Sequence, residues 1–267
     1  MQLNTLILGL VLVLVVMSLG WLIQRVRNDA GIVDVLWTFA VGALGILYSI
    51  LGDTLNERRL ILAIMVGVWS LRLGLYILFD RVIAKPEDGR YKYLRDHWGK
   101  NAHLHFFWFF QAQGLAAFFF SIPFYFISTN SSGLISVTEY LGVICWLIAI
   151  FGEWLSDSQL RSFRSNPNNK GKTCQSGLWK YSRHPNYFFE WLHWWSYVLM
   201  LVDANGFYLS LLCPAVMLYT LFKVTGIPHT EAQALRTRGE EYRRYQKTTS
   251  IFIPWFPRGN MPESKIC

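Results

Sequence analysis

Long apolar runs separated by shorter polar segments dominate the pattern along this chain. A helix needs about 20 apolar residues to cross a bilayer. Seven runs come close to that length: 5–23, 31–51, 60–79, 106–128, 135–157, 188–202 and 207–224, of which 188–202 is the shortest. The pattern predicts an all-α integral membrane bundle of seven transmembrane helices. The first run lacks the basic start and the cleavage site of a signal peptide, so we expect it to be retained.

Composition agrees with a membrane protein. Apolar residues make up 53% of the 267 residues and charged residues only 16%, against roughly 25% charged residues in soluble domains. The four cysteines have no pairing spacing and form no ligand set with histidines, so we expect neither a disulfide framework nor a metal site. The net charge of +8 comes from basic residues spread over several polar segments beside the spans. That spread gives no indication of nucleic-acid binding.

The distribution of Lys and Arg predicts an orientation. With seven spans, all but three of the 25 basic residues fall on one side of the membrane. The exceptions are Arg58 and Arg59 on the other side and Arg72 within a span. The positive-inside rule places the basic side and the C-terminus in the cytoplasm and the N-terminus outside. We expect a multi-pass monomer surrounded by membrane lipids.

Apart from Glu139 and Lys223 near the ends of spans, six ionisable residues lie inside the predicted spans, where charge is costly and usually faces a cavity or a partner. All six belong to the half of the membrane predicted to be cytoplasmic: Asp34, Arg72, Glu153, Asp157, Glu190 and His193. They indicate an internal site open to that side. Arg72 could pair with Asp34 or Asp157 or contact a phosphate, and we interpret His193 as a core residue.

Helical spacing groups some of these residues. Glu153, Asp157, Arg161 and Arg164 recur at intervals of four, four and three, so they share one helix face. Such a face could hold a ribose hydroxyl at its acidic end and a phosphate at its basic end. It could equally be a ladder of ion pairs within one helix. The polar segment 166–172 leaves the same choice open, as a phosphate-binding loop or a plain connector.

A second pair of polar residues stands at the start of the sixth run. Asn186 and Glu190 are one helical turn apart, and their amide and carboxylate could read a flat ring that carries an amide. The structural alternative is a helix start, with Pro185 in the first turn and Ser182 as the cap. His184 is more typical of a helix end than of a catalyst.

Three blocks of residues in the C-terminal half resemble the bacterial branch of the steroid 5α-reductase family. The first is Glu153-x-x-x-Asp157-x-Gln159-Leu160-x-x-Phe163-Arg164. The second is Gly177-Leu178-Trp179-x-Tyr181-Ser182-Arg183-His184-Pro185-Asn186-Tyr187-x-x-Glu190. The third is Gly239-Glu240-x-Tyr242-x-x-Tyr245-x-x-x-Thr249-x-x-Phe252-x-Pro254. The blocks occur in the family's order, and the likeness extends over most of the chain.

The resemblance implies an NADPH-dependent enone reductase of the bacterial inner membrane. Its substrate would be a 3-oxo-Δ4 steroid or a related lipid enone. Residues 1–130 would form a lipid-accessible pocket, and residues 131–267 would bind the cofactor. By family position, Asn186 and Glu190 hold the nicotinamide carboxamide, and a second group serves the ribose and phosphates: Asp157, Arg164 and Lys172. The further candidate cofactor residues are Glu153, Arg161, Tyr181, Ser182, Arg183, His184, Tyr187, Glu231 and Tyr242.

Three positions depart from the eukaryotic members of that family. Where those enzymes have an Arg and a His late in the chain, this sequence has Ile227 and Glu231. Their catalytic Tyr on the third span aligns with Trp69. The phenol that would polarise the ketone must therefore come from elsewhere.

The chemistry of enone reduction suggests where to look. Hydride addition to the β carbon develops negative charge on the carbonyl oxygen, so the site needs a donor aimed at that oxygen. Asp34 is the first candidate, because a buried carboxyl group that stays protonated can donate. Tyr91 is the second. Trp37, one turn beyond Asp34, is favoured as a wall of the substrate pocket.

The remaining pocket candidates are Trp69, Arg72 and Gln111, and Gln111 could instead bond a neighbouring helix. Two other functions stay open. Arg-His-Pro-x-Tyr before a span also marks the isoprenylcysteine and phospholipid methyltransferases, which bind S-adenosylmethionine. The basic set Arg161, Arg164 and Lys172 favours NADPH over that ligand. A non-catalytic sterol-binding protein is the second alternative.

Overall fold

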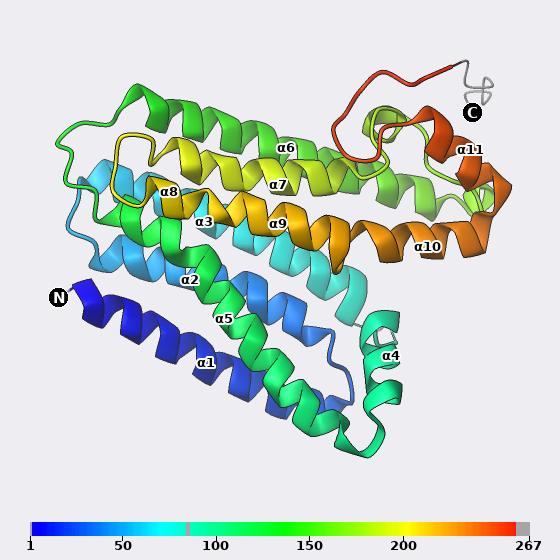
Figure 1. Ribbon diagram of the computed structural model, residues 1–267, viewed down its shortest axis with the longest axis horizontal. Coiled ribbons are helices and arrows are strands. Elements are labelled where there is room, and N and C mark those ends of the chain that lie inside the picture. The colour runs from blue at the N-terminus through cyan, green and yellow to red at the C-terminus, as the bar shows by residue number, and fades with distance from the viewer. Residues whose placement is uncertain (1, 84–85, 260–267) are drawn as a thin grey trace. The chain divides into compact units, whose positions relative to one another are not determined.

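The computed structural model describes residues 2–83 and 86–259, which contain helices and no strand (Figure 1). Six helical segments in these residues are long and apolar enough to cross a membrane: Leu3–Arg27, Ile32–Leu51, Asn56–Val82, Gly89–Ser128, Val137–Ser165 and Phe207–Arg238. The all-helical, multi-pass class predicted from the sequence is therefore confirmed.

The predicted count of seven spans is not confirmed. The sixth apolar run, 188–202, forms helix α7 (Pro185–Leu199) of 15 residues. At 1.5 Å per residue this helix is about 22 Å long. The hydrocarbon core of a bilayer is about 30 Å thick, so α7 alone is too short to cross it.

The described residues form two compact units. The first comprises the chain up to Val137 together with Leu201–Ser210. The second comprises Thr138–Met200 and the chain from Leu211 on. The functional division expected after residue 130 stays a prediction.

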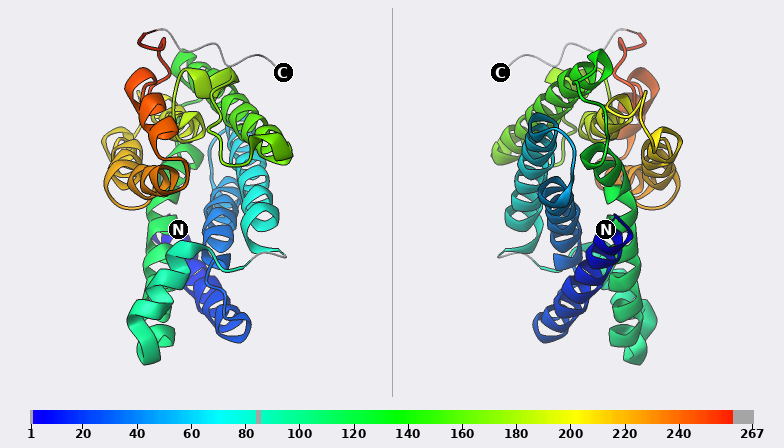
Figure 2. Two further views of the ribbon diagram at one scale, coloured as in Figure 1. Left: turned by 90° about the vertical axis from the view of Figure 1, so that its right-hand side faces the viewer. Right: turned by 90° about the vertical axis from the view of Figure 1, so that its left-hand side faces the viewer.

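The first unit is built on the packing of its long helices. Its elements are α1 (Gln2–Arg27), α2 (Ile32–Leu51), α3 (Asn56–Ile77), the π-helical turn η1 (Leu78–Val82), α4 (Gly89–Trp98), η2 (Gly99–Asn101), α5 (Ala102–Ser128) and α8 (Phe207–Ser210). Helix α2 packs against α3, α5 and α1, and Figure 2 shows α2 and α3 side by side. Apolar side chains fill these interfaces, including the fully buried Val41, Val66 and Phe124.

The second unit contains α6 (Val137–Ser165), α7, α9 (Leu212–Lys223), α10 (Ile227–Arg238) and α11 (Glu240–Thr248), with short turns η3 (Pro167–Asn169) and η4 (Gly177–Lys180). Helices α6 and α7 approach closely at Gly152 of α6. A Cβ atom added at Gly152 would lie only 2.4 Å from the Phe189 ring of α7. Cys145, Cys174 and Cys213 are free thiols. Cys267 lies outside the described residues.

Candidate functional site

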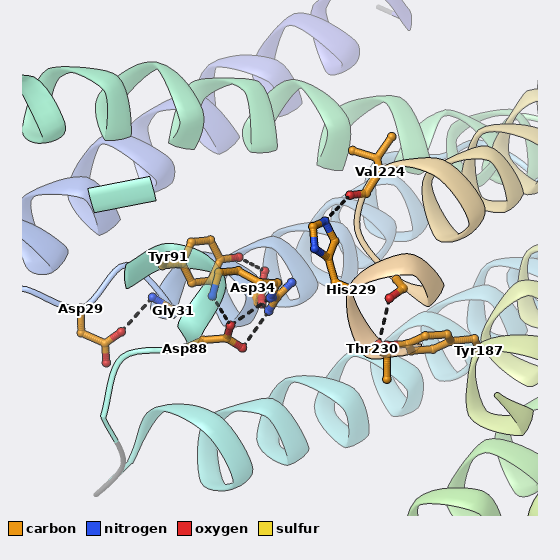
Figure 3. A network of polar contacts seen from close by, with 11 residues as sticks. Asp29, Gly31, Asp34, Asp88, Tyr91, Tyr187, Val224, His229 and Thr230 are labelled. Carbon is orange, nitrogen blue, oxygen red and sulfur yellow. Dashed lines mark hydrogen bonds and ion pairs between the residues drawn. The ribbon is translucent and has the colours of Figure 1, made fainter. Parts of the chain in front are cut away.

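The first unit brings the two predicted acid donors together. Asp34 lies in the first turn of α2, and Tyr91 lies in the first turn of α4. The Tyr91 hydroxyl donates to Asp34 Oδ1 at 2.6 Å (Figure 3). Tyr91 is 3% exposed, and its ring meets the Phe109 ring edge-on at 5.9 Å. The phenol is therefore held in one orientation by packing on its ring and by a carboxylate at its hydroxyl.

Arg90 completes this cluster. Its Nη2 donates to Asp34 Oδ2 at 3.0 Å, and its Nε donates to Asp88 Oδ1 at 3.0 Å. Its guanidinium also lies over the Tyr91 ring, 5.1 Å from the centroid. Both carboxylate oxygens of Asp34 thus accept hydrogen bonds, one from a guanidinium and one from a phenol. In this contact Tyr91 is the donor and Asp34 the acceptor, and the predicted role of Asp34 as an acid donor stays a prediction.

The start of α4 is fixed by the residues around this cluster. Asp88 is the N-cap of α4 and accepts from the backbone N–H of Arg90 at 3.0 Å. Burial opposes ionisation of Asp88, but the hydrogen bonds from Arg90 outweigh it and hold the pKa of that carboxyl below its ordinary value. Glu87 accepts from the backbone N–H of Ala30 at 2.8 Å and pairs with Arg95 at 2.8 Å. The charged segment 87–95 therefore contacts the connection between α1 and α2 through Glu87.

The predicted pocket residues are spread over three helices of the same unit. Trp69 of α3 is fully buried and meets Trp37 of α2 edge-on at 6.3 Å. Trp37 also contacts the ring of Phe120 at 5.7 Å. The Gln111 amide donates to Ser18 Oγ of α1 at 3.2 Å. Of the two roles considered for Gln111, the structure shows the bond to a neighbouring helix. Arg72 also lies on α3, and its predicted role stays a prediction.

The second unit carries the predicted cofactor residues. Helix α6 contains the four residues expected on one face, with Glu153 and Asp157 buried and Arg161 and Arg164 exposed. The Asn186 amide, from the first turn of α7, donates to Asp157 Oδ1 at 3.2 Å. The deep end of this face is thus a carboxylate and an amide, and the outer end is a pair of cations.

Glu231 of α10 is the centre of a second polar cluster. Its Oε1 lies 3.1 Å from Arg183 Nε and 3.3 Å from His184 Nε2. The same oxygen accepts from the Tyr242 hydroxyl at 3.3 Å, and Oε2 accepts from the Gln246 amide at 2.9 Å. Burial lowers the pKa of His184 below its ordinary value, although Glu231 acts in the opposite direction. Glu231 therefore joins three other predicted cofactor residues, Arg183, His184 and Tyr242, into one cluster.

The turn before α7 differs from the predicted helix cap. Ser182 Oγ accepts from the backbone N–H of His184 at 3.1 Å and donates to the Phe252 carbonyl at 2.7 Å. A cap would bond an N–H within the first turn of the helix, and α7 begins only at Pro185. The predicted cap role of Ser182 is therefore wrong, because Ser182 closes the preceding turn. Pro185 in the first turn is confirmed.

The other predicted residues of this unit lie around the same turn. Tyr187 stacks on His184, with ring centroids 5.3 Å apart, and its hydroxyl lies 3.4 Å from Thr230 Oγ1 (Figure 3). The Tyr181 carbonyl accepts from the backbone N–H of Trp255 at 2.9 Å. Glu190 follows Asn186 by one turn of α7, and Lys172 is exposed on the connection after α6.

Sequence reasoning missed several members of these clusters. Arg90 and Asp88 are neighbours of the predicted donor Tyr91 in the sequence. The bond from Arg90 to Asp34 spans 56 residues of chain, and Asp88 is the N-cap of α4. Gln246 follows Tyr242 by one turn of α11, and that spacing is the signal that could have found it. Tyr245 donates its hydroxyl to the carbonyls of Trp179 and Ser182.

The fold and these clusters define the class as an all-helical, multi-pass membrane protein with buried polar sites. Over residues 20–249 the chain matches the family described as "Protein of unknown function (DUF1295)", and it belongs to that family. The family is associated with steroid 5α-reductase-like proteins. No curated protein and no solved structure matches the chain.

Proposed function

We propose that the protein is an integral membrane reductase that uses NADPH to saturate the Δ4 double bond of a 3-oxo-Δ4 steroid or of a related lipid enone. The observation that carries the proposal is the buried Tyr91 hydroxyl, held 2.6 Å from Asp34. Reduction of an enone needs one oriented donor for the carbonyl oxygen, and a phenol can fill that role. The family's association with steroid 5α-reductase-like proteins supports the same reaction.

Tyr91 would polarise the substrate ketone. Its proton can turn about the C–O bond from Asp34 toward a carbonyl oxygen without movement of the ring. Asp34 holds the phenol oxygen in place and is itself held by Arg90, so little reorganisation is needed when charge develops on the substrate. One such preorganised donor is worth about 10²–10³ in rate. Trp37 would wall the pocket with its indole ring, which keeps water away from the reacting carbonyl.

The second unit would hold the cofactor, which supplies the hydride when bound. A dinucleotide phosphate presents two kinds of group, an anionic phosphate part and neutral ribose and carboxamide parts. The donor set fits both, because exposed cations stand at the outer end of the α6 face and Asp157 and Asn186 stand at its deep end. Arg164 and Lys172 would bind phosphates, while Asp157 would accept from a ribose hydroxyl. Asn186 and Glu190 would bind the carboxamide.

Ligand-dependent thermal stability tests the cofactor. A ligand present at about 100 times its Kd stabilises the folded protein by roughly 2.7 kcal/mol. NADPH should therefore raise the Tm of the detergent-purified protein, whereas S-adenosylmethionine should leave it unchanged. Stabilisation by S-adenosylmethionine alone would replace the reductase with the methyltransferase alternative.

Substitution of Tyr91 tests the chemistry. Tyr91→Phe keeps the buried ring and removes the donor, so kcat for an enone should fall by about 10²–10³ with the NADPH-induced Tm shift intact. Tyr93→Phe is the matched control, because Tyr93 lies on the same helix and is 68% exposed. Asp34→Asn should also lower kcat, since it weakens the pairing with Arg90. Equal turnover in the Tyr91 and Tyr93 variants would remove Tyr91 from the mechanism.

A further inference from the structure

The end of the second unit carries a basic helix face that the cofactor proposal does not use. In α11, Tyr242 and Tyr245 are buried, whereas Arg243, Arg244 and Lys247 are exposed. At 100° per residue the three basic positions lie opposite the two tyrosines. The helix is therefore anchored by its aromatic face and presents its basic face outward.

Large apolar side chains are exposed directly after this helix. Ile253, Trp255 and Phe256 are 58%, 66% and 75% exposed, and they lie outside the apolar segments that could cross a membrane. Exposed Trp and Phe at neighbouring positions are unusual on a surface that faces only water. Aromatic side chains of this kind are enriched where a protein meets the headgroup layer of a bilayer.

The backbone holds these side chains in place. The Trp255 N–H donates to the Tyr181 carbonyl at 2.9 Å, and the Arg258 N–H donates to the Thr248 carbonyl at 2.7 Å. The second bond brings the exposed Arg258 back to the end of α11. The segment that carries the exposed aromatic residues is thus tied by backbone hydrogen bonds both to the turn before α7 and to the end of α11.

The charge of this surface selects its partner. Residues 236–258 contain six basic and two acidic residues. Glu240 pairs with Arg243 at 2.6 Å, and Glu241 accepts from the backbone N–H of Thr173. The two carboxylates are thus committed to partners within the second unit, and the surface that remains is cationic with apolar side chains beside it. A neutral headgroup layer offers no counter-charge, whereas anionic phospholipids do.

We propose that Arg244, Lys247, Trp255, Phe256 and Arg258 form a docking surface for the anionic headgroups of the surrounding membrane. The basic side chains attract the lipid phosphates, and the aromatic rings enter the headgroup layer. The docking surface would fix the turn that carries Tyr181 to His184, because that turn is bonded to the same segment. This role is independent of the proposed reductase activity.

Hydrogen–deuterium exchange in nanodiscs tests the proposal. The full chain is reconstituted in discs of phosphatidylcholine alone or of phosphatidylcholine with phosphatidylglycerol, and exchange is followed for peptides that cover residues 240–259. We expect slower exchange only with phosphatidylglycerol. About 1 M salt should abolish the difference, because it shortens the Debye length to about 3 Å.

Two double variants identify the residues. Each neutralised basic residue should weaken the attraction to anionic lipid about fivefold. The measurement uses the phosphatidylglycerol fraction at which exchange in the unchanged protein is slowed to half its full extent. At that fraction, Arg244→Gln with Lys247→Gln should show no slowing of exchange. Lys92→Gln with Lys100→Gln is the charge-matched control, since both lysines are exposed on the first unit. Unaltered Tm values verify that the variants fold. Equal exchange in the two disc types, or equal loss in the two double variants, overturns the proposal.

Discussion

Replacing Arg58 with methionine should destabilise the protein far more than the same replacement at Arg59. Arg58 is 1% exposed, although it lies in the first turn of α3 beside a polar connection. Its guanidinium donates to three backbone carbonyls of the segment 130–134, at 2.8 to 3.1 Å, and to Thr54 Oγ1 at 2.7 Å. Methionine keeps the apolar stem and removes every donor.

Hydrogen bonds to a charged group contribute about 1.5–3 kcal/mol each, but the freed carbonyls lie at a helix connection and can recover water. We therefore expect a net loss of about 3 kcal/mol, well below the sum. At about 2–4 °C per kcal/mol for a chain of this size, the Tm should fall by roughly 6–12 °C. Arg59 is only partly buried and reaches Gly52 and Asn56, so its replacement should cost less than about 1 kcal/mol. Comparable Tm values for the two variants in thermal melts would refute the reasoning.

Two further predictions concern helix geometry. Asp88→Ala should cost about 1 kcal/mol, because it removes the N-cap of α4. Because the pKa of Asp88 is lowered in the folded protein, its contribution is complete above about pH 4 and disappears as the pH falls through the lower folded value. The Tm difference from the unchanged protein should shrink on acidification, and a constant difference would contradict it. Gly152→Ala should cost about 1–3 kcal/mol through contact with Phe189. Gly67→Ala, whose Cβ meets only Ile46 at 3.8 Å, should be neutral or stabilising in the same melts.

The apolar pattern was sufficient to predict the helical membrane class but insufficient for α7. Its apolar run reaches residue 202, whereas the helix ends at Leu199 and the chain then turns. Hydropathy measures which residues avoid water and does not register where backbone hydrogen bonding stops. The positions of the other spans were predictable because each combines apolar length with polar residues at both ends.

The local members of the site were also predictable, whereas their roles were not. Helical spacing placed Asn186 one turn before Glu190 and aligned Glu153 with Asp157, because such spacing depends on chain geometry alone. The role of Asp34 depends on a cation that arrives from α4, 56 residues further along the chain. A sequence pattern shows that a buried carboxyl group needs a partner, and only the fold shows that Arg90 is a partner of Asp34.

The distribution of basic residues between the two sides of the membrane is evidence on whether α7 crosses it. Arg58 and Arg59 bond backbone carbonyls, so a structural role accounts for the two basic residues that the charge pattern places on the opposite side. If α7 did not cross, the chain after α10 would lie on the same side as those two arginines, and the basic residues of α11 would be separated from those of α4. The positive-inside rule penalises that division. The charge rule therefore still favours the predicted seventh crossing, which stays a prediction because only six segments of the described residues are long and apolar enough to cross.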